Sequence, residues 1–120
     1  MQEPVTSGRT LQLEARSEGK HRVLKVSGQL TETETAEFLE ALKREMKSGS
    51  PRLILDMDGL QYMSSAGLGA LVSMHPAFLG AGVRLIVAGT NSKVRKLLTL
   101  TSLDKLIESA DSVEEAIGRP

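Results

Sequence analysis

The sequence contains no cysteine and no tryptophan, and it has one tyrosine and two phenylalanines. The absence of cysteine excludes a disulfide framework and thiolate metal sites, and it agrees with a reducing compartment. With so few aromatic side chains, stacking platforms for nucleobases or flat cofactors are nearly absent. The core must therefore be built from aliphatic residues and methionine.

The chain also lacks a net charge, because fifteen basic residues balance fifteen acidic residues. Such a chain has no long-range field that attracts nucleic acid or an anionic membrane, so we expect neither as a partner. No apolar run approaches the roughly 20 residues of a membrane helix, and the start of the chain lacks the pattern of a signal peptide. We predict a cytoplasmic protein.

What is present suffices for one domain. The 120 residues are 40% hydrophobic, which is enough to bury a single modest core. Residues 1–10 mix proline, serine, glycine and charges without periodicity, and we predict a flexible N-terminal arm there. Residues 11–120 form the predicted domain.

Apolar patterns predict the strands of a sheet. Apolar residues alternate from Leu11 to Ala15, and after a turn at 17–20 they continue in 23–26, which is typical of an antiparallel hairpin. The continuous apolar runs at 53–55 and 83–88 suit strands that are covered on both faces. A short segment around Leu106-Ile107 is a further candidate strand.

Helical spacing and capping residues predict about four helices. Thr31 and Glu34 form a predicted capping box, and Pro76 is expected to kink or break the helix that contains it. The helices are expected at 32–48, from about 65 to 80, after Asn91-Ser92 and after Asp111-Ser112. Strands and helices that alternate in this order predict an α/β fold with a mixed, mostly parallel sheet.

Two adjacent serines, Ser64 and Ser65, stand where the sheet leads into a helix, and function in open α/β sheets collects at such junctions. From residue type alone, a helix N-cap is the more frequent role. A phosphate is also tolerated there, because free N–H groups and the helix dipole favour an anion. The second interpretation is therefore a switch that changes binding without unfolding the domain.

A catalytic serine would also suit a strand-to-helix turn. The segment 63–67 lacks the first glycine of G-x-S-x-G, and His21 and His75 are the two histidines available as a base. His21 lies in the hairpin, and His75 lies roughly 15 Å along the helix from the serines. We therefore predict no catalytic residue and no enzymatic activity.

Other polar residues give weak signals. Asp56 and Asp58 alternate at a strand end, where we expect them to accept hydrogen bonds from loop amides and support the site locally. Two isolated histidines and no phosphate-binding motif predict neither a metal nor a cofactor. A solvated helix face explains the basic cluster of Lys93, Arg95 and Lys96.

Several short segments form a pattern through their order and spacing. They are Gly28-Gln29-Leu30, Leu53-Ile54-Leu55-Asp56, Tyr62-Met63-Ser64-Ser65-Ala66-Gly67-Leu68, Gly82-Val83-Arg84-Leu85, Val94 to Leu98 and Leu103-Asp104. This pattern resembles the STAS domain of bacterial anti-sigma-factor antagonists. The resemblance covers nearly the whole chain from about Leu11.

The resemblance implies a partner-switching function. The unmodified protein would bind an anti-sigma factor that is a serine kinase of the ATP-binding type, and the sigma factor would be released. Phosphorylation at Ser65, aligned on Gly67-Leu68, would abolish binding, and a metal-dependent serine phosphatase would reverse it; Ser64 is the less favoured acceptor. The residues expected to bind the partner are Gly28, Gln29, Thr31, Glu32, Thr33, Ser64, Ser65, Ala66, Gly67 and Gly69.

Three positions depart from the family pattern. Ser64 stands where Asp often precedes the phosphorylated serine, Ser102 stands where glycine is common, and Pro76 is unusual in this helix. An alternative function uses the same docking face without a phosphate cycle, as a structural STAS subunit of a transport or sensory complex.

Overall fold

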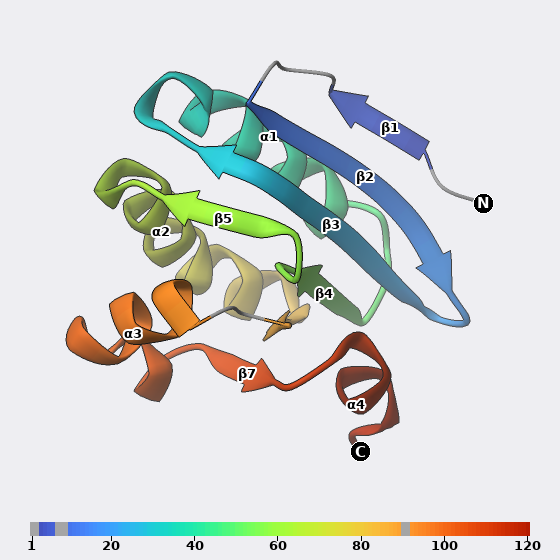
Figure 1. Cartoon of the computed structure of the whole chain (residues 1–120). Coiled ribbons are helices and arrows are strands. Elements are labelled where there is room, and N and C mark those ends of the chain that lie inside the picture. The colour runs from blue at the N-terminus through green and yellow to red at the C-terminus, as the bar shows by residue number, and fades with distance from the viewer. Residues whose placement is uncertain (1–2, 7–9, 90–91) are drawn as a thin grey trace.

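The computed structural model describes residues 3–6, 10–89 and 92–120, and within these ranges seven strands form one sheet (Figure 1). The strands are β1 (Glu3–Thr6), β2 (Leu11–Glu18), β3 (His21–Leu30), β4 (Arg52–Asp56), β5 (Leu60–Met63), β6 (Arg84–Ala88) and β7 (Glu108–Ala110). The helices are α1 (Thr35–Met46), α2 (Ser65–Ala81), α3 (Ser92–Leu100) and α4 (Val113–Gly118), with short 3-10 turns η1 (Glu32–Glu34) and η2 (Leu103–Lys105).

The sheet is mixed and mostly parallel, as predicted. Its strand order is β1-β2-β3-β4-β6-β7, and β5 pairs with the end of β3 outside this path. β1, β2 and β3 pair antiparallel, whereas β3 with β4, β3 with β5, β4 with β6, and β6 with β7 pair parallel. The predicted hairpin of β2 and β3 is confirmed.

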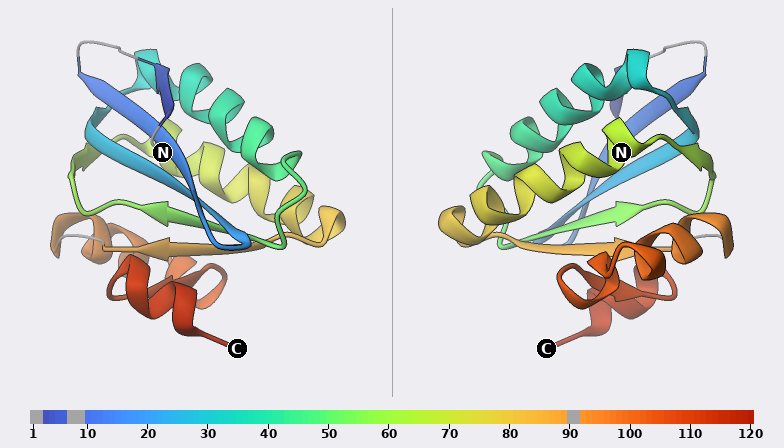
Figure 2. Two further views of the ribbon diagram at one scale, coloured as in Figure 1. Left: turned by 90° about the vertical axis from the view of Figure 1, so that its right-hand side faces the viewer. Right: turned by 90° about the vertical axis from the view of Figure 1, so that its left-hand side faces the viewer.

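Helices cover the two faces unequally. Figure 2 shows α1 and α2 against one face of the sheet and α4 on the opposite side. The larger core lies under α1 and α2, where Phe38 and Phe78 are fully buried. A smaller cluster under α4 packs Val113 and Ala116 against Ile54 of β4 and neighbouring apolar residues. The apolar side chains of the central strands are thus covered on both faces, as their continuous runs predict.

Three strands differ from the prediction. Residues 3–6 lie in the predicted arm, yet they form β1 and pair with β2. β5 was not predicted, and β7 begins at Glu108 instead of at Leu106-Ile107. These strands have three or four residues, so pairing with another strand of the sheet outweighs their own weak pattern.

The beginning of α1 corrects the predicted capping box. Thr31 makes no side-chain cap, and η1 precedes α1. The carboxylate of Glu34 does not bond the Thr31 amide; its Oε1 accepts from the Thr31 hydroxyl at 3.4 Å and from the Thr10 hydroxyl. The box fails because Glu34 is held by Thr10, a residue distant in sequence.

The other helices largely follow their signals. α2 continues across Pro76 without the predicted break, and Gly82 ends it in the left-handed conformation, with φ of 72°. Ser112 caps α4, because its Oγ accepts from the Glu115 N–H at 3.1 Å. α3 begins at Ser92, and the predicted cap residue Asn91 lies outside the described residues.

Candidate functional site

Parallel pairing of β3 with β5 brings the end of β3 and the turn η1 next to the beginning of α2. Leu30 lies opposite Met63, and the Ser64 N–H donates to the Leu30 carbonyl at 2.8 Å. The turn η1, which follows β3, contacts α2, which follows β5. The segments 28–33 and 64–69, which contain all the predicted partner-binding residues, therefore adjoin each other. We call these two segments the β3–β5 edge.

Ser64 is the structural serine of this edge. Its side chain is 6% exposed, and its Oγ accepts from the Gly67 N–H at 3.1 Å. Its extended backbone, with φ of −73° and ψ of 165°, is that of an N-cap residue. The capping role expected of a serine at this junction thus belongs to Ser64.

Ser65 is the first residue of α2, and it is exposed. Ala66 is half-buried beside it, and Gly69, one turn further, is exposed with open space where a side chain would stand. On the other segment, Gln29, Glu32 and Thr33 are exposed and Thr31 is half-buried. The outer surface of the β3–β5 edge therefore consists of small and polar side chains.

Two predicted partner-binding glycines shape the edge from within. Gly67 is buried, and a Cβ there would lie 2.7 Å from Leu30 Cδ2. Gly28 has φ of 89°, and a Cβ there would collide with the Thr10 carbonyl oxygen. Both positions require glycine for close packing.

Sequence reasoning missed an exposed aromatic residue beside the serines. This residue is Tyr62, the sole tyrosine of the chain, and it is 52% exposed. It lines a mostly apolar hollow of about 190 Å³ between β5 and α3, with Val94 and Leu97 opposite. A lone aromatic residue two positions before Ser64 was the available signal.

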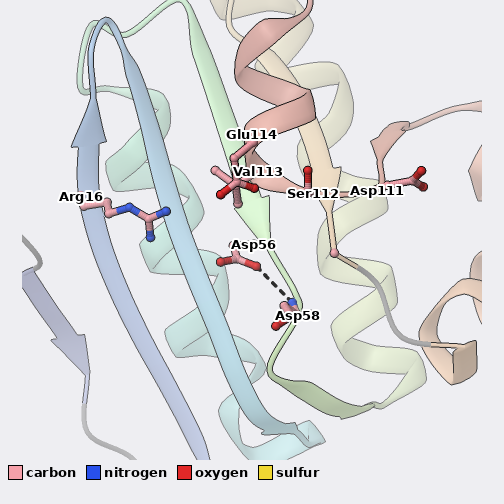
Figure 3. Close-up of a pocket in the computed structure, with 8 residues that line it drawn as sticks. Arg16, Asp56, Asp58, Asp111, Ser112, Val113 and Glu114 are labelled. Carbon is pink, nitrogen blue, oxygen red and sulfur yellow. Dashed lines mark hydrogen bonds between the residues drawn. The ribbon is translucent and has the colours of Figure 1, made fainter.

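Asp56 and Asp58 lie away from the serines, in a hollow of about 290 Å³ that β2, β4 and the start of α4 line (Figure 3). The carboxylate of Asp56 accepts from the Asp58 N–H at 3.1 Å, which is the expected bond to a loop amide. Asp111 points away from this pair in Figure 3, and its Oδ1 lies 3.6 Å from Arg95 Nη2.

Within the described ranges, no group of three or more His, Asp or Glu side chains converges as metal ligands.

The histidines are distant from Ser65 in the fold. His21 begins β3, at the opposite end of that strand from Leu30, and His75 is half-buried ten residues down α2. Burial, with Arg52 and Lys20 nearby, lowers the pKa of His21. Neither residue is placed to act as a base for the serine hydroxyl.

An ion-pair network lies at the other end of the molecule. The hydrogen bond from Arg84 holds the pKa of Glu108 below its usual value, and a second bond from Arg119 adds to this effect. The same bonds raise the pKa of Arg84, and those from Arg119 to Glu115 and Glu108 raise that of Arg119. The network ties β6 and β7 to the end of α4.

These features define a class of protein: a small α/β domain that presents a serine at the N-terminus of a helix, beside the loop of a neighbouring parallel strand. Among the described helices, none is long and apolar enough to cross a membrane. The chain belongs to the STAS domain family, whose sequence profile matches residues 12–116.

Relatives of this chain are named as anti-sigma-factor antagonists. The anti-sigma-B factor antagonist of Staphylococcus aureus (strain NCTC 8325 / PS 47) is 25% identical over 104 residues, which cover 87% of this chain and 96% of that protein. An anti-sigma factor antagonist structure from Mycobacterium paratuberculosis has a TM-score of 0.83 at 18% identity, over 93% of this chain and 95% of that one. Phosphorylated SpoIIAA from Bacillus has a TM-score of 0.66 at 21% identity, over 89% and 96%. These structural likenesses show the shared fold.

Proposed function

We propose that this protein is an anti-sigma-factor antagonist in a partner-switching pathway and that Ser65 is its phosphorylation site. The unphosphorylated form binds an anti-sigma factor, a serine kinase of the ATP-binding type, and thereby releases the sigma factor. Phosphorylation of Ser65 by that kinase ends the binding, and a metal-dependent serine phosphatase restores it. The names of the relatives support the role, and one of them is known in a phosphorylated form.

The observation that carries the choice of serine is the contrast in burial. The Ser64 hydroxyl is buried and engaged by the Gly67 N–H, whereas Ser65 is exposed at the start of α2. A kinase needs an accessible hydroxyl, so Ser65 is the available acceptor. The helix N-terminus also tolerates the new charge without unfolding.

The phosphate would act on docking rather than on the fold. The β3–β5 edge presents the small residues Ala66 and Gly69 around Ser65, which allow a partner to approach the backbone closely. A phosphoserine adds about −1.5 to −2 of charge and three oxygens at the centre of this surface. Close packing then becomes impossible without desolvating the dianion, which raises the dissociation rate.

Phosphorylation with matched variants tests the proposal. We expect the cognate anti-sigma factor and ATP to add one phosphate to the wild type, located at Ser65 by peptide mass spectrometry. Ser65→Ala should accept none. Ser64→Asp should still accept one, because Asp preserves the N-cap while removing the neighbouring hydroxyl. A phosphate that persists in Ser65→Ala would contradict the assignment.

Binding measurements test the switch itself. Ser65→Asp or the phosphorylated protein should bind the anti-sigma factor at least about tenfold more weakly than the wild type, since like charges and buried dianions cost several kcal/mol at an interface. Ser109→Asp, at an exposed position of β7 outside the β3–β5 edge, is the control for added charge, and it should bind nearly as well as the wild type. Equal affinity of Ser65→Asp and the wild type would instead favour the scaffold function, which copurification with a transporter or sensory component would identify.

A further inference from the structure

A residue outside the predicted domain anchors one half of the β3–β5 edge. Thr10 directly precedes β2 and stands two positions before the matched family span of 12–116. Its carbonyl oxygen accepts from the Gln29 N–H at 2.6 Å. The same carbonyl occupies the space where a Cβ on Gly28 would stand. The backbone of Thr10 therefore lies against the end of β3, where the segment 28–33 begins.

The side chain of Thr10 reaches the end of the same segment. Its hydroxyl donates to Glu34 Oε1, which also accepts from the Thr31 hydroxyl at 3.4 Å. The other carboxylate oxygen, Oε2, is buried without a hydrogen-bond partner in the described part of the chain. Because Oε2 has no donor there, the hydroxyls of Thr10 and Thr31 on Oε1 are the groups that hold this carboxylate in place.

Glu34 in turn fixes the start of α1. Its N–H donates to the Thr31 carbonyl at 3.2 Å, and the Thr35 hydroxyl donates to that carbonyl at 3.2 Å. Glu34 and Thr31 make no side-chain helix cap. The segment is thus held at its beginning by the carbonyl of Thr10 and at its end by the hydroxyl.

We infer that Thr10 is a positioning residue for partner binding, and that its hydroxyl holds the segment of residues 28–33, the end of β3 and the start of η1, in the conformation that docks beside Ser65. The expected effect on partner affinity rests on the proposed function, whereas the expected effect on the conformation of residues 28–33 does not. Losing the hydroxyl leaves the Glu34 carboxylate with one long hydrogen bond, from the Thr31 hydroxyl, so the segment 28–33 should open more often while the core stays intact.

Amide hydrogen exchange on the full chain measures the segment without any partner. In Thr10→Val, which keeps the side-chain shape and removes the hydroxyl, we expect the Gln29 and Glu34 amides to exchange about tenfold faster, as the loss of one charge-assisted bond implies. Thr10→Ser keeps the hydroxyl and should exchange like the wild type. The Leu55 amide, in the centre of the sheet, reports global stability and should be unchanged.

Binding to the anti-sigma factor measures the consequence. We expect Thr10→Val to bind several-fold more weakly and Thr10→Ser to bind like the wild type. One side-chain hydrogen bond joins the two residues. The double variant Thr10→Val, Glu34→Ala should therefore bind no more weakly than whichever single variant binds more weakly.

Three outcomes would overturn the inference. One is equal Gln29 and Glu34 exchange in Thr10→Val and Thr10→Ser, and another is unchanged affinity in Thr10→Val. The third is additive loss in the double variant. A wild type that does not bind the anti-sigma factor defeats the proposed function instead, and the exchange data then decide alone whether Thr10 holds the segment.

Discussion

Two neighbouring serines have different surroundings because of where the helix begins. The N-cap position turns the Ser64 side chain inward over the first turn, and the next position, Ser65, faces solvent. The sequence pattern predicts that one of them caps the helix, and capping preferences alone do not distinguish them. The distinction depends on the exact residue at which α2 starts, which the pairing of β5 with β3 determines.

Gly67 and Gly69 provide a residue-scale prediction about packing. Gly67→Ala should lower the free energy of unfolding by about 1–3 kcal/mol, because its Cβ would lie 2.7 Å from the buried side chain of Leu30. Gly69→Ala has open space and should raise it by up to about 1 kcal/mol through helix propensity. Urea denaturation measures both. Equal effects of the two variants would show that Leu30 can move aside freely.

At the scale of elements, the sequence predicts those helices and strands that carry a long apolar pattern. The core strands β4 and β6 and the long helix α2 carry continuous or periodic apolar runs, and they were predicted. β5 has four residues, and its two central side chains, Gln61 and Tyr62, are exposed. Its identity as a strand comes from β3, which is some 30 residues away in the sequence. The hollow beside Tyr62 was missed for the same reason.

The connection after α3 yields an element-scale prediction. Ser102 adopts φ of 60°, a left-handed conformation that costs a residue with a Cβ about 1 kcal/mol. Ser102→Gly should therefore raise the free energy of unfolding by about 0.5–1 kcal/mol in urea denaturation. Ser73→Gly, the same substitution within α2, should lower the free energy of unfolding by a similar amount. A destabilised Ser102→Gly would mean that its hydroxyl matters more than its backbone.

At the scale of the whole molecule, arginines hold α4 across the sheet. Arg52 of β4 is buried, and its Nη1 donates to the Ala116 carbonyl at 2.6 Å at the end of α4. Arg84 of β6 and Arg119 both donate to Glu108 of β7. A six-residue helix is marginal on its own, so its position depends on these bonds and on the small apolar cluster beneath it.

This network predicts how stability depends on pH. The pKa of Glu108 is lowered in the fold from an ordinary value of 4.5, chiefly by the hydrogen bond from Arg84, so the unfolded chain takes up a proton first. The stabilisation is therefore fully present above about pH 5 and is lost as the pH falls through the lowered pKa. Glu108→Gln should be less stable than the wild type at pH 7, and the difference should shrink below pH 4.5, as urea denaturation at each pH will measure. Glu114→Gln, a surface exchange in α4, controls for the loss of a carboxylate. A difference that stays constant from pH 7 to pH 3 would show that Glu108 acts through packing, because only its ionised form attracts the two guanidinium groups.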